Sequence, residues 1–140
     1  MFSNTAGRMT PMRHLVLYVA CVALIAACLS ACQESLEQRA AREARQYTSK
    51  CCPLRVDEFT VMDSMTFVAS ASTLCYWYTL SDTADRTYTE TERQQASALL
   101  QKNLHNNTHL KVYREAGYAF RYVYRSASDA QTVRLDITLH

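Results

Sequence analysis

The chain has 140 residues and a formal net charge of +2 at pH 7, from 15 basic and 13 acidic residues. Such a balance does not favour a nucleic-acid-binding protein, which normally carries a basic patch or stripe. Only two glycines and two prolines are present, which argues against a low-complexity chain. The length and composition therefore indicate one small folded domain.

Residues 1–31 have the layout of a secretory signal peptide. Arg8 and Arg13 precede Leu15–Leu29, a run without charge that ends at Leu29-Ser30-Ala31-Cys32. A basic region, an apolar region and a small-residue site in this order are typical of a cleavable signal. The alternative is a retained transmembrane anchor, which needs about 18 or more apolar residues. Both interpretations place the rest of the chain outside the cytoplasm.

The stretch Leu29-Ser30-Ala31-Cys32 resembles the lipobox of bacterial lipoproteins, in which the cysteine is lipidated and becomes the first residue after cleavage. The resemblance implies lipidation of Cys32 and a membrane anchor through that lipid. Gln33 follows the cysteine in place of Asp, which by the same resemblance favours the outer membrane of a Gram-negative cell envelope. Cleavage removes Arg8 and Arg13, so the mature chain is neutral.

Residues 32–50 are rich in Gln, Glu, Arg and Ala, which are good helix formers. They predict a polar helix with one narrow apolar stripe, which either packs on the domain or serves as a stalk. The stripe consists of Leu36, Ala40, Ala44 and Tyr47.

Residues 51–140 predict a single α+β domain that opens with a hairpin. Phe59–Phe67 and Leu74–Leu80 alternate with a period of two, and Ser70-Ala71-Ser72 between them predicts the turn. The residues expected on one face of the first strand are Phe59, Val61, Met65 and Phe67.

A helix is predicted after this hairpin. Thr89 followed by Glu92 resembles a capping box at a helix start, and Asn103–Asn107 mark the expected end. Gly117 then fits a residue that ends a short helical turn in the left-handed conformation.

A second hairpin is predicted from Tyr118–Arg125 and Val133–Leu139, both of which alternate with a period of two. The predicted order is helix, strand, strand, helix, strand, strand. The fold class is therefore α+β, with a small antiparallel four-stranded sheet and helix packed on one face.

Six cysteines are present, of which three remain after signal cleavage and lipidation of Cys32. In an oxidising compartment a disulfide is the favoured interpretation, and Cys75 would pair with Cys51 or Cys52. A catalytic thiol is the alternative, but it requires a neighbouring base that no motif supplies.

Metal and cofactor chemistry find little support in the sequence. Cys51 and Cys52 are adjacent and lack the separation of zinc ligands. His105 and His109 have helical spacing but no zincin-like glutamate, so they are interpreted as surface histidines. We predict no catalytic residue, no metal site and no cofactor.

Aromatic residues are concentrated in two of the predicted strands, where they either form the core or supply a recognition surface. If the helices cover the tyrosine face of the sheet, the opposite face carries Trp77, Arg121 and Arg125. These three residues form the candidate binding face.

The core also resembles a group of small uncharacterised bacterial envelope proteins over about residues 52–139. In some relatives a second cysteine lies where this chain has His105 and Asn106, which leaves the partner of Cys52 open. The matching residues are Cys52-Pro53, Val56-Asp57-Glu58, Tyr76-Trp77-Tyr78-Thr79-Leu80, Asn103–Asn107, Gly117 and Phe120–Arg125.

These features predict a lipid-anchored bacterial envelope protein that binds an envelope protein partner or has a structural role, without enzymatic activity and without nucleic acid. Two alternatives stay open. One is a periplasmic thiol-dependent or hydrolytic enzyme, and the other is a lipoprotein that binds a small ligand.

Overall fold

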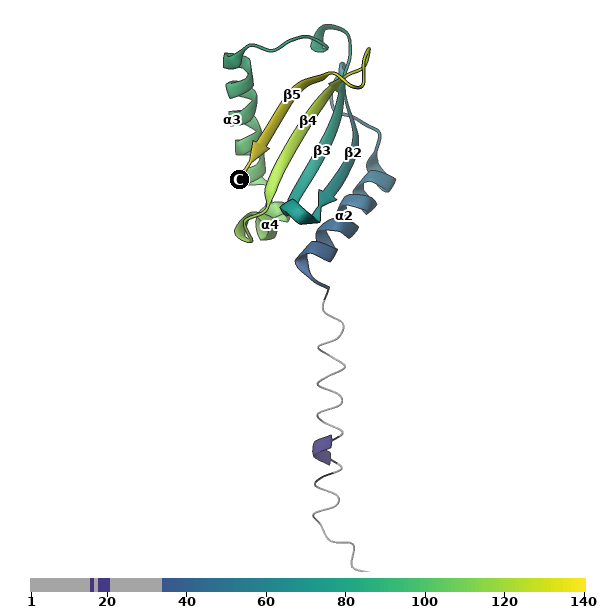
Figure 1. The fold of residues 1–140 in the computed structure, drawn as a ribbon, viewed down its shortest axis with the longest axis vertical. Coiled ribbons are helices and arrows are strands. Elements are labelled where there is room, and N and C mark those ends of the chain that lie inside the picture. The colour runs from purple at the N-terminus through teal and green to yellow at the C-terminus, as the bar shows by residue number, and fades with distance from the viewer. Residues whose placement is uncertain (1–15, 17, 21–33) are drawn as a thin grey trace, which may run out of the picture. The chain divides into compact units, whose positions relative to one another are not determined.

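The computed structural model describes residues 16, 18–20 and 34–140 of the chain. The predicted signal peptide lies largely outside this part, and the lipobox with Cys32 lies wholly outside it. Within the described residues, no helix is both long enough and apolar enough to cross a membrane. Ser35–His140 form one compact unit (Figure 1).

The unit contains three helices and five strands, joined by short 3-10 turns. Figure 1 shows their arrangement. In chain order they are α2 (Leu36–Cys51), β1 (Leu54–Arg55), β2 (Thr60–Val68), β3 (Thr73–Leu80), α3 (Glu90–Asn106), α4 (Lys111–Glu115), β4 (Ala119–Ser126) and β5 (Val133–Leu139).

The strands form one mixed sheet in the order β1-β2-β3-β4-β5. Both predicted hairpins are present, as antiparallel pairs β2-β3 and β4-β5. The prediction of an antiparallel four-stranded sheet is wrong, because β3 and β4 run parallel. The helical connection through α3 returns the chain to the end of the sheet where β3 began, and a crossover of this kind joins parallel strands.

Two details of the first hairpin differ from the expectation. Strand β1, which the sequence did not predict, has only two residues and pairs with Val61 and Met62. It is too short to produce a periodic signal. A register shift lies between Met62 and Ser64. Such a bulge reverses the side-chain alternation, so Met62, with 4% of its surface exposed, is buried with Met65 in place of the expected Val61.

The helices lie on the tyrosine face of the sheet. Helix α2 packs against β2, and α3 packs against β5. Ala40 and Ala44 of α2 and Leu104 of α3 are almost completely buried in the core with Phe120 of β4. The apolar stripe of α2 therefore packs on the sheet, and the compact unit begins at Ser35.

Local signals in the sequence are found at the helix ends. Glu92 donates its backbone N–H to Thr89 Oγ1 at 3.3 Å, and its carboxylate accepts from Thr89 N at 2.8 Å, which completes the predicted capping box. Gly117 follows α4 with φ +79°, a left-handed conformation that glycine adopts without a side-chain penalty. An additional capping box joins Ser35 and Gln38 at the start of α2.

Candidate functional site

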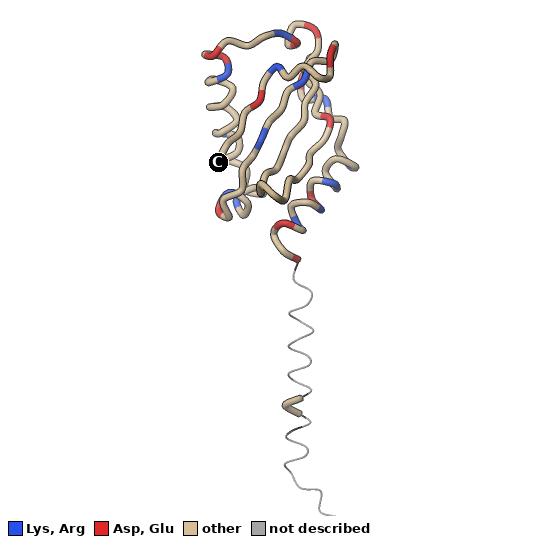
Figure 2. Tube along the Cα trace, in the orientation of Figure 1, with Lys and Arg blue, Asp and Glu red and all other residues tan. Residues whose placement is uncertain are grey.

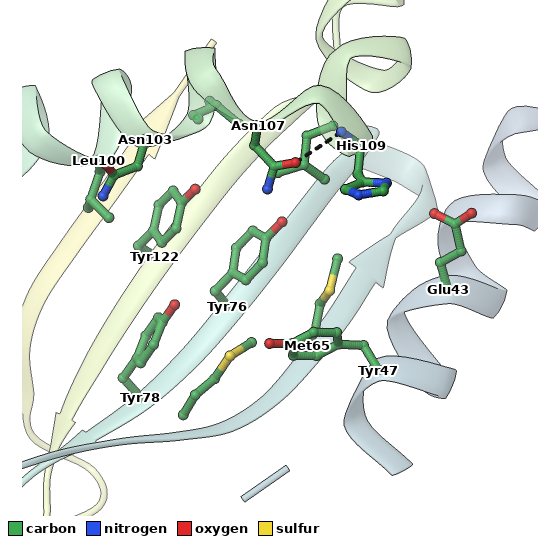
Figure 3. A pocket seen from close by; sticks show the side chains of 13 residues that line it. Glu43, Tyr47, Met65, Tyr76, Tyr78, Leu100, Asn103, Asn107, His109 and Tyr122 are labelled. Carbon is green, nitrogen blue, oxygen red and sulfur yellow. Dashed lines mark hydrogen bonds between the residues drawn. The ribbon is translucent and has the colours of Figure 1, made fainter. Parts of the chain in front are cut away.

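A cleft of about 500 Å³ opens on the helix-covered face, because α2 and α3 flank the sheet and leave the middle strands uncovered (Figure 3). Its floor is formed by tyrosines of β3 and β4 and by two methionines of β2. The lining residues are Glu43, Tyr47, Met62, Met65, Tyr76, Tyr78, Leu100, Asn103, Leu104, Asn107, His109, Leu110 and Tyr122.

The tyrosines of the floor are aligned by the parallel pairing of β3 and β4. Tyr76 lies beside Tyr122 and Tyr78 beside Tyr124, with ring centroids 4.8 Å and 4.6 Å apart and nearly parallel planes. Stacking of this kind adds to the stabilisation from buried area. It also fixes the rings on edge, so that the hydroxyls of Tyr76 and Tyr122 point into the cleft (Figure 3).

These hydroxyls have no hydrogen-bond partner within the described part of the chain. Tyr76 is only 9% exposed and Tyr122 only 7%, so their rings are buried, while their hydroxyls meet the open volume of the cleft. Burial raises the pKa of Tyr122 to about 12 and raises the pKa of Tyr76 as well. Both hydroxyls are therefore protonated at neutral pH and available as donors.

The wall on the α2 side includes one carboxylate, Glu43, which is already paired. Arg39 Nε donates to it at 2.7 Å, and the hydroxyl of Tyr113 donates at 2.7 Å. Burial alone would raise the pKa of Glu43, but these two hydrogen bonds outweigh it and hold the pKa below its ordinary value. Among the lining residues Glu43 is the only Asp, Glu, Lys or Arg, so the cleft has little uncompensated charge.

The polar groups of the opposite wall come from the end of α3 and the turn that follows it, and they include no Asp, Glu, Lys or Arg. Asn103 lies near the end of α3, and Asn107 caps the turn that follows, where its side-chain oxygen accepts from His109 N at 3.0 Å (Figure 3). His109 is exposed, as predicted. It also lines this wall of the cleft. His105 does not line the cleft and contacts Arg114 at 3.1 Å.

The predicted binding face lies on the other side of the sheet, which no helix covers in the described chain. Arg125 lies over the ring of Trp77 at 4.3 Å. Arg121 Nε donates to Asp136 at 2.9 Å, and Trp77 Nε1 donates to Thr66 at 2.8 Å. The structure brings the three predicted residues onto one face, where Arg125 contacts Trp77 and the other polar groups bind Asp136 and Thr66.

The three cysteines of the domain are free thiols in the structure. Cys52 packs against the core of the helix-covered face, whereas Cys75 lines a shallow hollow on the open face with Arg121 and Asp136. Burial raises the pKa of the Cys75 thiol, and Arg121 opposes this shift in part. The predicted disulfide is not formed here and stays a prediction.

Charge does not single out a site on the domain surface. Figure 2 shows acidic and basic residues alternating along α2, where Arg39 and Glu43 form an ion pair at 2.7 Å. Within the described residues no cluster of three or more His, Cys, Asp or Glu side chains has the arrangement of a metal site. The cleft is the better candidate because it combines volume with unsatisfied polar groups.

Comparisons with known proteins agree with this picture of the fold. Residues 35–135 match the family described as Domain of unknown function (DUF8479). The chain belongs to this family. No curated protein sequence matches it.

Two solved structures are similar to this member of the family. One is the crystal structure of PA3611, a candidate secreted protein of Pseudomonas aeruginosa, with TM-score 0.58 and 11% identity over 76% of this chain and 95% of that one. The other is the type II secretion system pilotin AspS of Vibrio cholerae, with TM-score 0.52 and 15% identity over 74% and 87%. At such identities the likeness concerns the fold.

Proposed function

We propose that the protein is a lipid-anchored component of the bacterial cell envelope, attached through Cys32. The signal-like residues 1–31 and the lipobox support this location. The fold adds support, because it resembles those of a candidate secreted protein and of a secretion-system pilotin.

Replacement of Cys32 by alanine tests the anchor. The variant should be released from the membrane or accumulate unprocessed, without a lipid label. Membrane retention of an unlabelled protein with unchanged mass in both wild type and variant would instead support the transmembrane anchor.

The role that the geometry supports best is binding of an envelope protein partner, and we propose the cleft between α2 and α3 as its site. The observation that carries this proposal is the pair of hydroxyls on the buried rings of Tyr76 and Tyr122, which lack protein partners and point into an open volume. A tyrosine hydroxyl that faces an open cleft is a donor that an acceptor of a bound segment can reach. A bound segment would supply acceptors to the hydroxyls of Tyr76 and Tyr122 and would lie against Met62 and Met65, which line the floor.

The open face is the weaker candidate. Trp77, Arg121 and Arg125 are already engaged with Thr66, Asp136 and each other. A partner that bound there would have to replace these interactions with equivalent ones. The cleft makes no such demand, because its hydroxyls would lose no protein partner.

Photocrosslinking in cells separates the two faces. Benzoylphenylalanine in place of Tyr47, which is 38% exposed at the rim of the cleft, should give a covalent adduct with one envelope protein. The same residue in place of Arg121 probes the open face in an otherwise identical chain. An adduct from position 121 and none from position 47 would show that the partner uses the open face.

The two alternative functions have distinct outcomes in related experiments. A small-ligand-binding lipoprotein would give no protein adduct from either position, although the cleft volume lies within the range of ligand pockets. A thiol-dependent enzyme would lose activity when Cys51, Cys52 and Cys75 are replaced by alanine. Our proposal expects that replacement to alter stability alone.

A further inference from the structure

We infer that the segment of the partner that enters the cleft is uncharged and presents hydrogen-bond acceptors, such as amide or hydroxyl oxygens, to the hydroxyls of Tyr76 and Tyr122. This inference rests on the proposed binding function and specifies the chemistry of the occupant. It follows from the charges, the donors and the apolar surface of the lining.

Charge is the first constraint. A charged group that leaves water for a cleft requires an opposite charge in contact with it, or its desolvation is not offset. Among the lining residues, Glu43 is the only Asp, Glu, Lys or Arg. It is paired with Arg39 and hydrogen-bonded to Tyr113. A cationic group would compete with Arg39 for Glu43, and an anionic group would find no Lys or Arg among the lining residues.

Hydrogen bonding is the second constraint. The hydroxyls of Tyr76 and Tyr122 point into the cleft and lack protein partners, and their buried rings are held in place because each is stacked on the other at 4.8 Å. Across the cleft, the carboxamide of Asn103 offers both a donor and an acceptor. Neutral amide and hydroxyl groups match this set without the desolvation penalty of a charge.

Apolar surface is the third constraint. Met62 and Met65 line the floor beside the tyrosines, and Leu100 and Leu110 line the opposite wall. Methionine side chains adapt to irregular apolar shapes. The partner segment should therefore carry at least one apolar side chain between its neutral polar groups.

A pair of opposite charges at one position tests the inference in the full-length protein. Asn103 is exposed and lines the cleft. Asn103→Lys therefore adds a positive charge to the cleft and Asn103→Glu a negative one, whereas Asn103→Gln keeps the position uncharged. The readout is the fraction of protein crosslinked through benzoylphenylalanine at position 47. Gln101→Lys and Gln101→Glu are matched controls, because Gln101 is an exposed residue of α3 that does not line the cleft.

We expect both charged variants at position 103 to lower the crosslinked fraction at least about tenfold, which corresponds to about 1.4 kcal/mol, while Asn103→Gln and the Gln101 variants leave it unchanged. The double variant Tyr76→Phe, Tyr122→Phe should lower it about two- to tenfold through the lost hydrogen bonds. Tyr124→Phe, which alters a hydroxyl that does not line the cleft, should have no effect. Equal thermal unfolding midpoints would confirm that each variant is folded.

If one sign at position 103 preserves or raises the crosslinked fraction, the partner segment carries the opposite charge and the inference is wrong. If neither charge changes it, the bound segment does not discriminate against charge at this position, and the inference is also wrong. In both cases the wild-type adduct from position 47 persists, so the proposed function stands. Loss of that adduct from the wild type itself would overturn the proposed function instead.

Discussion

Thr48 of α2 satisfies both outward backbone groups of Met65 in β2. Its hydroxyl oxygen accepts from Met65 N at 2.8 Å and donates to Met65 O, also at 2.8 Å. Strand β1 pairs only with Val61 and Met62, so this stretch of β2 has an open edge. Unpaired edges invite association with other strands, and Thr48 closes this one while it fixes α2 beside the cleft.

Replacement of Thr48 by valine keeps the side-chain shape and removes both hydrogen bonds. We expect the free energy of unfolding to fall by about 1–3 kcal/mol, the usual cost of leaving a partly buried polar group unsatisfied. Ser49→Ala is the matched control, since Ser49 is exposed and bonds only within its own helix. Urea unfolding of both variants measures the difference, and equal stabilities would show that Thr48 does not hold α2 in place.

A second long-range contact fixes the far end of the sheet. Asp85, in the connection between β3 and α3, accepts from Ser126 Oγ at 2.6 Å and pairs with Arg134 Nε at 2.7 Å. The hydrogen bond from Ser126, followed by that from Arg134, lowers the pKa of Asp85 from 3.8 to about 2. The carboxylate thereby joins the α3 connection to the turn between β4 and β5.

The sign of the pH dependence follows from this shift. The folded state binds the Asp85 proton less readily than the unfolded chain, so the stabilisation is complete above about pH 5 and is lost as the pH falls from about 4 towards 2. Asp85→Asn should lower stability at pH 7, and its difference from the wild type should shrink across that window. The stability of Asp85→Asn should still fall with pH, but less steeply than that of the wild type, because the pKa of Glu92 is also lowered to about 2, chiefly by Arg86.

Thermal unfolding at pH 7, 5, 4, 3 and 2 measures this dependence. Asp82→Asn supplies the control, as an exposed carboxylate in the same connection. A constant difference between Asp85→Asn and the wild type at all pH values would contradict the assignment.

Maleimide labelling without reductant tests the state of the cysteines. Cys51 is exposed and Cys75 is only 2% exposed, and burial raises the pKa of Cys75, which further slows its reaction. The structure therefore predicts rapid labelling of Cys51 and protection of Cys75 until the protein is unfolded. If Cys75 in the unfolded protein reacts only after reduction, the disulfide predicted from the sequence exists.

The local structure was predictable from the sequence because its signals are local. Thr89 and Glu92 mark a helix start, Gly117 supplies a positive φ, and period-two alternation marks both hairpins. The parallel pairing of β3 with β4 was not predictable in the same way, since alternation is identical in parallel and antiparallel strands. It depends on where the α3 connection returns the chain.

The cleft was missed for a related reason. Alternation placed Tyr76 and Tyr122 on the covered face, and a covered tyrosine is normally part of the core. Only the spacing of α2 and α3 on the sheet leaves their hydroxyls without partners. The sequence offered one hint, namely two strands with Tyr-x-Tyr spacing, since so many buried hydroxyls require partners.

Footprinting in cells tests the central claim that the cleft, and not the open face, is occupied by a partner. In a Cys51→Ser background, Asn103→Cys places a thiol in the cleft, and Val68→Cys places one on the open face beside the hollow that contains Cys75. The maleimide reaction rate of each is compared between intact cells and purified full-length protein. We predict that the cells slow the reaction at position 103 at least about tenfold and leave position 68 unchanged. Protection of position 68 with free reaction at position 103 would contradict the account.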